Sequence, residues 1–504
     1  MPSGDPVDVC LLMEGSYPYV LGGVSSWTHD VIRAYPDLTF HVVALVADRN
    51  PRKLAYELPP NVKGLTHVYL QEPDAGWPWT YRAAELFRRI ETPLLQLQQG
   101  GGLAEVEEVV RLLAPRRPRI GRRVLLNSED AFRMVVRLYE QTLPDASFLE
   151  YFWGLRALMG GMFSVMLAPM PAAKVYHAVS TGYAGLFAAR ARLETGRPAI
   201  LTEHGIYTNE RRIEILMAEW LFEGSDMSLA VEKKKRDLRD LWLDTFASYS
   251  KACYDACDQI FTLYGGNQEF QRRQGAEPEK LKIIPNGIDY AGYSKVPRDT
   301  SERPPTIALI GRVVPIKDVK TYIRAAGILR EDIPDLKAMI LGPLEEDPQY
   351  VEECRTIVRH LDLEDTVIFA GRVKLTDWLG KVDAIALTSV SEAQPLVILE
   401  AGAAGVPTVA TDVGSCAELI LGRADEEPAI GPGGAITPLA SPLDTARELR
   451  ELLLDPVWRD RCAAAIKERV RRYYDKKEID RIYRGVYETY RTMPDRPALF
   501  GKAA

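Results

Sequence analysis

Two glutamates eight positions apart, Glu392 and Glu400, are the residue pair whose spacing points most directly to chemistry. A hydrophobic strand is expected over 384–388, just before them, and a small-residue stretch at 401–405 follows. Glu392 is therefore expected in the loop after a buried strand, and Glu400 inside the next helix. Ligands of open α/β sheets bind at the carboxyl ends of strands, where helix N-termini point at them. The two carboxylates could hold the hydroxyls of a sugar and a ribose; alternatively, Glu392 caps a helix and Glu400 is an ordinary helical residue.

Two cations follow another expected strand, at 306–310. Gly311 lets the backbone turn sharply at the strand end, and Arg312 and Lys317 come directly after it. The guanidinium of Arg312 can donate two parallel hydrogen bonds to phosphate oxygens, and Lys317 adds a compact positive charge, so one anionic group could bind both. Alternatively, the two cations form ordinary salt bridges at the surface. The sequence contains no Walker A loop and no Asp-x-Asp pair. A leaving diphosphate would then be held without a metal, by these cations and by helix N-termini.

Two glycines, Gly22 and Gly23, lie in the loop between an expected strand at 7–13 and a helix at 25–34. A glycine pair permits close approach of the backbone to a ligand, although a plain turn explains it equally. The sequence lacks a G-x-G-x-x-G pattern, which gives no support to a dinucleotide site.

Two histidines stand at the ends of expected strands of the N-terminal half: His177 is the last residue of 174–177, and His204 follows 199–203. A histidine at a carboxyl strand end, followed by a flexible glycine as His204 is, suits hydrogen bonding or proton transfer. We expect one of the two to be structural instead. The other histidines show no metal-site spacing.

The composition is that of a globular protein of several domains, with 504 residues, 46% hydrophobic and 26% charged. A net charge of −7 argues against nucleic acid as a partner. Cys253 and Cys257 are interpreted as buried thiols. The first residues show no export signal, and the apolar run at 157–173 is too short to span a membrane. These features favour the cytoplasm; the basic run at 233–236 is expected to be a solvated helix face, with docking to anionic lipid as the alternative.

The order of expected elements predicts α/β architecture in both halves. The first half opens as strand, loop, helix and strand, carries a long helical insertion at about 79–165, and then returns to strands. A polar, proline-containing segment at 289–305 is expected to be a linker. The second half alternates strand and helix, as a doubly wound parallel sheet does. We therefore expect two Rossmann-like domains facing a cleft.

The motifs in combination are more specific than any one of them. Asn286 to Asp289, the Gly-Arg-x4-Lys segment from Gly311 and the Glu-x7-Glu segment from Glu392 occur in this order. Together with the glycine pair and His204, they resemble retaining GT-B glycosyltransferases of family 4. The segments 10–27 and 201–211 look like the PelF subgroup, the cytosolic glycosyltransferases of Pel exopolysaccharide synthesis, and the likeness covers essentially the whole chain. The chain departs from typical members in reading Ala393-Gln394-Pro395 after Glu392.

The resemblance implies roles for individual residues. Glu392 and His204 would contact the transferred sugar, Glu400 the ribose hydroxyls, and Arg312 and Lys317 the diphosphate. The donor-binding set that it implies is Gly23, Gly311, Gly342, Arg372, Gln394, Pro395, Leu396, Val397 and Glu400. Within this set, the backbone N–H groups of Gln394, Leu396 and Val397 would lie beside sugar and phosphate. Gly342 and Arg372 would lie near the base, and Gly23 near the phosphate or acceptor.

The resemblance also implies the activity. The expectation is a retaining hexosyltransferase that uses a UDP-sugar, with UDP-glucose as the best guess, and extends a Pel-type polysaccharide acceptor without a metal or other cofactor. Its partners would include an inner-membrane Pel synthesis complex, with the protein cytoplasmic or peripheral at that membrane. The expected domains are 1–292 and 300–475, with a last helix in 476–504 that crosses back to the first domain. A nucleotide-sugar epimerase and a non-catalytic assembly subunit remain the alternatives.

Overall fold

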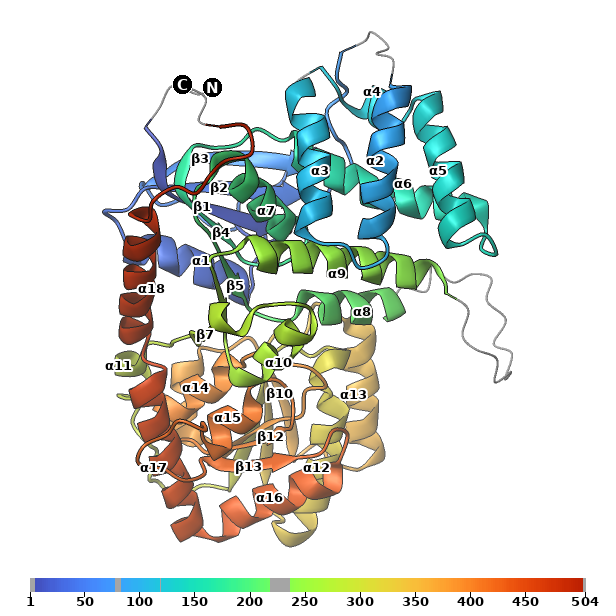
Figure 1. The fold of residues 1–504 in the computed structure, drawn as a ribbon. Helices are drawn as coiled ribbons and strands as arrows, with labels where there is room; N and C mark the ends of the chain where they lie inside the picture. Colours follow the sequence, from blue (N-terminus) through green and yellow to red (C-terminus); the bar gives the residue numbers. More distant parts are fainter. Residues whose placement is uncertain (1–4, 78–82, 118, 218–235, 502–504) are drawn as a thin grey trace. The chain divides into compact units, whose positions relative to one another are not determined.

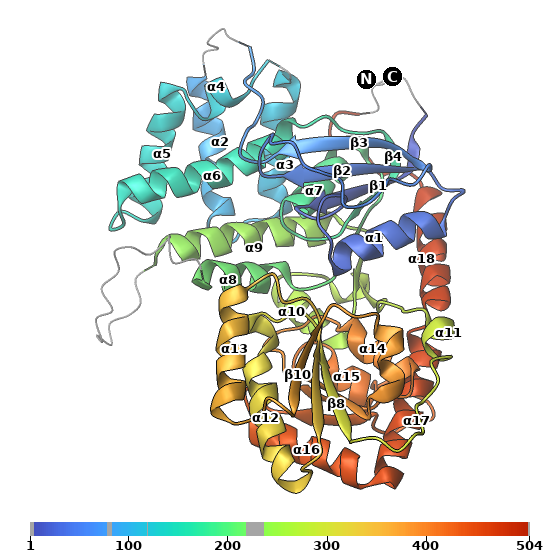
Figure 2. The same ribbon diagram turned by 180° about the vertical axis from the view of Figure 1, so that it is seen from behind.

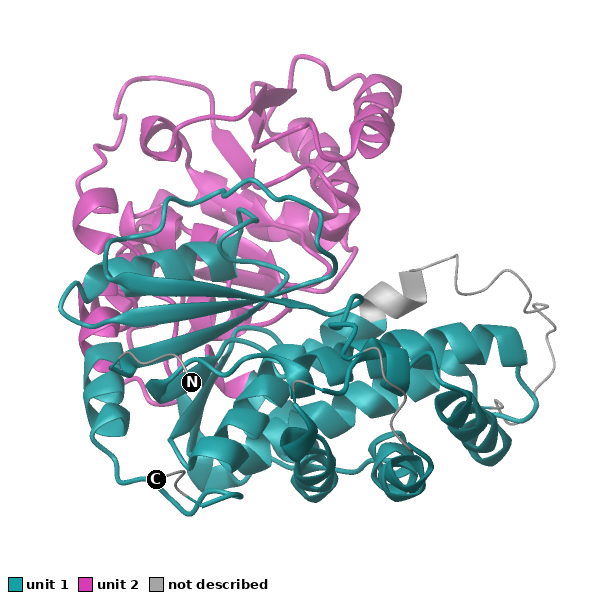
Figure 3. Cartoon of the chain, turned by 90° about the horizontal axis from the view of Figure 1, so that it is seen from above, with its two compact units in different colours: residues 1–262, 267–283, 483–504 teal, residues 263–266, 284–482 magenta. Residues whose placement is uncertain are grey.

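The computed structural model describes residues 5–77, 83–117, 119–217 and 236–501, and the chain forms two compact units. Unit 1 comprises residues 1–262, 267–283 and 483–504, and unit 2 comprises residues 263–266 and 284–482 (Figure 3). Each unit contains one sheet in which every paired strand is parallel. Residues 483–501, near the end of the chain, belong to unit 1.

The sheet of unit 1 has seven strands in the order β3-β2-β1-β4-β5-β6-β7. The strands are β1 (Val7–Glu14), β2 (Phe40–Val46), β3 (Val62–Tyr69), β4 (Ala173–Ala178), β5 (Ala199–Glu203), β6 (Gln259–Thr262) and β7 (Leu281–Ile283). Val9 to Met13 of β1 are completely buried, because helices cover both faces of the sheet. Strands covered on both faces are continuously hydrophobic, which is why β1 is recognisable in the sequence.

Different helices cover the two faces of this sheet (Figures 1 and 2). Alternate strand residues such as Cys10 and Leu12 pack with α7 (Tyr183–Thr195), α9 (Leu238–Ala256) and the helical insertion. The insertion contains α2 (Ala84–Leu97), α3 (Leu103–Leu113), α4 (Arg122–Leu125), α5 (Glu129–Thr142) and α6 (Phe148–Leu167). Its buried side chains belong to the same hydrophobic cluster as the sheet, so the insertion is part of the core of unit 1.

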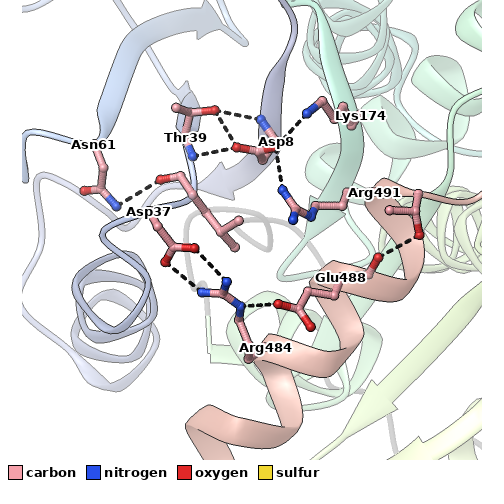
Figure 4. Close-up of polar contacts among 10 residues, drawn as sticks. Asp8, Asp37, Thr39, Asn61, Lys174, Arg484, Glu488 and Arg491 are labelled. Carbon is pink, nitrogen blue, oxygen red and sulfur yellow. Dashed lines mark hydrogen bonds and ion pairs between the residues drawn. The ribbon is translucent and has the colours of Figure 1, made fainter.

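The opposite face is covered by α1 (Gly23–Ala34) and by the last part of α18 (Lys476–Arg491). Figure 4 shows the polar contacts that hold the last part of α18, from Tyr483 onward, within unit 1. Arg484 donates to both carboxylate oxygens of Asp37, at 2.7 and 2.6 Å, and Arg491 lies 3.2 Å from Asp8. Asp8 also accepts hydrogen bonds from Thr39 and Lys174, and these contacts outweigh burial and lower its pKa to about 2.

The sheet of unit 2 has six strands in the order β10-β9-β8-β11-β12-β13. The strands are β8 (Thr306–Ile310), β9 (Lys337–Leu341), β10 (Val367–Gly371), β11 (Ala384–Leu387), β12 (Thr408–Thr411) and β13 (Gly434–Thr437). One set of alternate strand residues packs with α12 (Val319–Asp332), α13 (Pro348–His360) and α16 (Pro442–Leu454). The other set packs with α14 (Leu396–Ala403) and α15 (Cys416–Leu421), so helices cover both faces of the sheet, as in doubly wound folds. The remaining helices of the second half are α11 (Tyr290–Tyr293) and α17 (Pro456–Tyr473).

The structure differs from the expected elements in a few places. The sequence pattern missed β3, whose residues are mostly half-buried, and it missed β13 and α15, which are short. The sequence pattern also predicts a short helix near 376–381, where the structure has two 3₁₀ turns. Residues 284–292 belong to unit 2 rather than to the first domain, because Ile288 forms backbone hydrogen bonds with Tyr474 and Lys476.

The six cysteines are all free and buried, as expected for Cys253 and Cys257, whose sulfurs lie 3.8 Å apart. The apolar run at 157–173 falls largely in α6, a helix of the core. None of the helices in the described ranges is long and apolar enough to cross a membrane. Lys233, Lys234 and Lys235 of the basic run lie outside the described residues.

Candidate active site

The strand order of unit 2 reverses between β8 and β11, and this is where Lys317 and Glu392 meet. Strands β9 and β10 follow β8 on one side of it. After β10 the chain crosses to the other side of β8, where β11, β12 and β13 follow in that order. Lys317 follows β8 and Glu392 follows β11, and Lys317 Nζ lies 2.5 Å from Glu392 Oε1. Both side chains are largely buried. Ligands of doubly wound sheets bind at such a switch point, so the sheet topology brings two of the expected residues to the expected place.

The two loops that carry this ion pair are hydrogen-bonded to each other. Thr388 donates its hydroxyl to the carbonyls of Lys317 and Asp318, at 3.1 and 2.9 Å. Ser389 donates to Glu392 Oε1 at 2.6 Å, so the carboxylate has a second donor besides Lys317. The loops are therefore held together independently of the ion pair, and an anion that takes Lys317 away from Glu392 need not open them.

Three glycines form a continuous backbone edge beside this pair. Gly311, Gly342 and Gly371 end or follow the adjacent strands β8, β9 and β10. The N–H of Gly311 donates to Leu341 at 3.0 Å, and that of Gly342 donates to Gly371 at 2.9 Å. A Cβ on Gly342 would lie 1.9 Å from the carbonyl oxygen of Gly311, so only glycine fits there. A Cβ on Gly371 would meet nothing within 4 Å, and one on Gly311 would lie 3.6 Å from the Lys317 side chain, so the edge is open at Gly371 and bordered by Lys317 at Gly311.

The two arginines expected at the site lie at its exposed side. Arg312 is paired with Glu346 at 2.8 Å, and about half of its side chain is exposed. Arg372 follows β10, two strands away from β8, and lies 4.0 Å from Glu345 with most of its side chain in solvent. Neither is in the Lys317–Glu392 ion pair, and an anion would have to draw Arg312 away from Glu346 to engage both cations.

Glu400 lies inside α14 and has a partner that the sequence did not reveal. Tyr293 of α11 donates its hydroxyl to Glu400 Oε1 at 3.0 Å. Burial raises the pKa of Glu400, and the Tyr293 hydrogen bond opposes that rise. Pro395 caps α14, and Leu396 and Val397 are its first residues, whose N–H groups have no acceptor within the helix. The start of α14 thus presents the backbone donors that the resemblance implies for this segment.

Gln394 carries a buried amide group that is only half satisfied. Its Oε1 accepts the backbone N–H of Asn286 at 2.7 Å, and its Nε2 has no partner. Asn286 Oδ1 and Ser415 Oγ are also buried without partners, and the N–H of Ser415 donates to the carbonyl of Ala393. Buried polar atoms normally have hydrogen-bond partners. The missing partners of this cluster beside Glu392 could therefore be supplied by a bound ligand or by water.

His204 and the glycine pair are the expected site residues of unit 1. The sheet of this unit also reverses its strand order, between β1 and β4, and β5 lies next to β4. His204 follows β5 and is 92% buried, with its Nε2 unpartnered. Burial lowers its pKa to about 4, so the imidazole is neutral near pH 7. A Cβ on Gly23 would meet nothing within 4 Å, so the protein itself leaves the space at the start of α1 open.

His177 is the structural one of the two histidines. It is fully buried, and its ring nitrogens lie 2.9 Å from the Tyr487 hydroxyl and 2.8 Å from Thr202 Oγ1. Burial lowers its pKa to about 3. Both nitrogens are satisfied by protein groups, whereas Nε2 of His204 is not, and this contrast distinguishes the two.

Several polar residues near the switch point of unit 1 were missed by the sequence pattern. Glu14, at the end of β1, accepts hydrogen bonds from the Tyr207 hydroxyl at 2.6 Å and the Ala184 N–H at 3.2 Å. Ser16 and Ser180, which follow β1 and β4, have buried hydroxyls without partners. Their positions after strands were the available signal, but serines and glutamates at strand ends are too common for the pattern to single them out.

No cluster of three His, Cys, Asp or Glu side chains suited to a metal ion occurs among the described residues. The groups that the two sites present are cations, carboxylates, a neutral imidazole and the start of a helix. Such groups can bind a phosphorylated, hydroxyl-rich ligand and stabilise charge that develops on it.

A family model described as domain of unknown function (DUF3492) matches residues 7–279, more than half of the chain. The chain belongs to the DUF3492 family. In this DUF3492 protein a second model, described as glycosyl transferases group 1, matches residues 295–469, and this range contains the Lys317–Glu392 pair.

Curated relatives match part of the DUF3492 protein. A D-inositol 3-phosphate glycosyltransferase of Kineococcus radiotolerans is 30% identical over 227 residues, which are 40% of this chain and 52% of the relative. One of Pseudarthrobacter chlorophenolicus is 32% identical over 165 residues, 30% of this chain and 39% of the relative. The match thus spans about half or less of the relatives' length.

Two solved structures resemble this protein over nearly its full length. Sucrose-phosphate synthase from Thermosynechococcus elongatus has a TM-score of 0.56 at 15% identity and covers 95% of this chain and 99% of its own. Anabaena HepE in complex with UDP has a TM-score of 0.55 at 14% identity, with the same coverage. These likenesses show the fold, and they confirm the expected GT-B class of two Rossmann-like domains.

Proposed function

We propose that this DUF3492 protein is a retaining glycosyltransferase that takes a hexose from a UDP-sugar and adds it to an exopolysaccharide of the Pel type. The observation that carries the proposal is the Lys317–Glu392 pair at the switch point of unit 2, beside the glycine edge. The group 1 match over the same residues supports the reaction class. UDP as the nucleotide and glucose as the sugar rest on the sequence resemblance, as do the Pel acceptor, the membrane complex and the cytoplasmic location.

In the proposed reaction, unit 2 binds the donor. Lys317 leaves Glu392 for the diphosphate and neutralises the charge that develops as it departs, together with Arg312 and the start of α14. Glu392, released from Lys317 but still held by Ser389, accepts hydroxyls of the transferred sugar. Glu400, oriented by Tyr293, accepts the ribose hydroxyls.

The base lies along the glycine edge at Gly311 and Gly342, with Arg372 at its exposed side. In unit 1, the neutral imidazole of His204 hydrogen-bonds the transferred sugar through Nε2, and Gly23 leaves room for phosphate or acceptor. The leaving diphosphate takes the acceptor's proton, so the new glycosidic bond forms on the face from which the diphosphate departs. Orientation and electrostatics supply most of the catalysis, and no metal is required.

The test is mass spectrometry of the products formed from a panel of UDP-, ADP- and GDP-sugars, with oligosaccharide acceptors. Transfer of a hexose with release of UDP is expected. An isomerised sugar nucleotide without free UDP would instead establish an epimerase. Donor binding without turnover on every acceptor would overturn the transferase and leave an assembly subunit.

A further inference from the structure

Glu203, the last residue of β5, is a buried carboxylate that the proposed reaction does not use. Only 1% of it is exposed, and no ion pair joins it to a Lys, Arg or His among the described residues. Its oxygens are surrounded by hydrogen-bond donors instead. A buried charge without a counter-ion is costly, so its retention here calls for a role.

The donors come from four different segments of unit 1. Tyr254 of α9 and Gln271 of α10 (Gly265–Arg273) each donate to Oε2 at 2.8 Å. The backbone N–H of Tyr207, at the start of α8 (Tyr207–Met217), and the hydroxyl of Thr181, before α7, lie 3.4 Å from Oε1. One carboxylate therefore joins the end of β5 to three helices and a loop.

Glu203 and His204 point to opposite faces of the sheet. Side chains alternate along a strand, and Glu203 contacts α9 while the imidazole of His204 packs on Trp27 of α1, with ring centroids 4.8 Å apart. The loop 204–206 runs from this strand end to Tyr207, whose N–H is bonded to Glu203. At one end of the loop that carries His204, Glu203 is anchored through its own carboxylate to Tyr254 and Gln271. At the other end, the same carboxylate holds the N–H of Tyr207.

We propose that Glu203 is the positioning residue of His204, and that its ionised carboxylate fixes the loop 204–206 by accepting hydrogen bonds from the elements around it. The proposal rests on the proposed function for its effect on the reaction, but the positioning itself is a property of unit 1.

Protonation of Glu203 would disturb this arrangement. The Tyr207 N–H and the Gln271 NH₂ group can only donate, whereas the hydroxyls of Tyr254 and Thr181 can also accept, so a carboxylic acid must rearrange these hydrogen bonds to place its own proton. Burial raises the pKa of Glu203, and the hydrogen bonds from Gln271, Tyr254 and Tyr207 lower it. Burial has the larger effect, so the pKa is raised to about 7. The other ionisable groups facing it are Glu210 on α8, which raises that pKa further, and Cys253 on α9.

The pH dependence of the loop follows from these contacts. Near pH 8 the carboxylate is ionised and His204 is held. As the pH falls through 7, the carboxylate becomes protonated and the loop loosens, although His204 itself stays neutral down to about pH 4.

The experiment compares Glu203→Gln and Tyr254→Phe with the wild type between pH 5.5 and 9. Donor hydrolysis or transfer is measured for kcat and KM, and the imidazole signals are followed by ¹⁵N-histidine NMR. The chain has only six histidines, and His204→Ala assigns the relevant signal. Glu269→Gln, an exposed change on α10, is the matched control and should behave as wild type.

In the wild type, kcat and the His204 signal should change together near pH 7. Glu203→Gln should lower kcat about tenfold, a typical effect of imperfect positioning, leave the donor KM within about twofold and remove the transition near pH 7. Tyr254→Phe should move that transition to higher pH, because it removes a hydrogen bond that favours the ionised form.

A His204 signal that is the same at every pH in the wild type and in Glu203→Gln would overturn the positioning role. If the wild type turned over none of the sugar nucleotides, the proposed function would fail, while the NMR comparison would still decide the role of Glu203. If Glu203→Gln does not fold, the direction of the Tyr254→Phe shift decides it.

Discussion

The hydroxyl of Tyr487 lies 2.9 Å from Nδ1 of His177, which joins the last helix of the chain to the fourth strand of unit 1. Both side chains are fully buried, and Tyr483, one turn earlier in α18, hydrogen-bonds Thr202 at 3.1 Å. With the ion pairs of Arg484 and Arg491, these contacts make the end of α18 a part of unit 1 rather than an appended tail.

We expect Tyr487→Ala to destabilise unit 1 by about 3–5 kcal/mol, because it removes a large buried ring and leaves His177 short of a partner. Tyr487→Phe keeps the ring and should cost only about 1–2 kcal/mol. The free energy of unfolding in urea measures both, and Arg481→Ala, largely exposed on the same helix, is the control. Equal stability of Tyr487→Ala and wild type would show that unit 1 does not need α18.

Lys317→Ala should reduce transfer at least about 100-fold, because it removes the cation that receives the leaving diphosphate. UDP release is the measurement. Lys320→Ala is the matched control, since Lys320 lies on the adjoining helix and also forms an ion pair, with Glu353 at 2.6 Å. Comparable activity in the two variants would remove Lys317 from the site.

Gly342→Ala and Gly23→Ala should separate folding from function. The new Cβ at position 342 would overlap the carbonyl of Gly311, so the melting temperature of unit 2 should fall. The new Cβ at position 23 meets no protein atom within 4 Å, so stability should be kept while transfer falls. Full activity of a stable Gly23→Ala protein would argue against a ligand at the start of α1.

Arg469→Met should destabilise unit 2 by about 3–5 kcal/mol, because it leaves a buried carboxylate without its partner. Arg469 is fully buried, forms an ion pair with Glu426, and donates to the carbonyls of Ile420 at 3.0 Å and Gly431 at 2.6 Å. Burial opposes ionisation of Glu426, but the Arg469 contacts prevail and lower its pKa. Chemical denaturation compared with Arg471→Met, an exposed change on the same helix, checks the prediction.

Glu203 should also make stability depend on pH. Its pKa rises from an ordinary 4.5 to about 7 on folding, so the stability it contributes is present below pH 4.5 and is lost as the pH rises through 7. The loss for this one group is about 3 kcal/mol at most. The difference in unfolding free energy between Glu203→Gln and wild type should therefore shift in favour of the variant from pH 5 to pH 8. A difference independent of pH would contradict the raised pKa.

Much of the fold follows from the sequence because buried parallel strands are hydrophobic throughout. The pattern located β5 and β8 to the residue, and placed β1, β4 and β11 within one residue at each end. It missed β3, where half-burial breaks the hydrophobic run, and β13, a strand of four residues that begins with Gly434, directly after Gly433, and carries little signal. Short edge strands are fixed by pairing with a neighbour, which a local pattern does not contain.

The site was predictable only in part, for a related reason. Lys317 and Glu392 could be placed at strand ends, but their direct contact depends on β8 and β11 being neighbours. Tyr293 contacts Glu400 and Trp27 contacts His204 from segments far away in the chain, and the partners of Glu203, such as Tyr254, are equally distant; no motif marks any of them. The roles assigned to Lys317 and Gly23 are predictions that the variants above test.

The burial of all six thiols has a practical consequence for studying motion in this protein. Maleimide dyes react with accessible cysteines, so the native side chains should stay unlabelled under folding conditions. Cysteines introduced at exposed positions, such as Glu57 in unit 1 and Glu345 in unit 2, would then carry a donor and an acceptor fluorophore without prior removal of native thiols. Energy transfer between the dyes would report in real time whether a sugar nucleotide changes the separation of the two units.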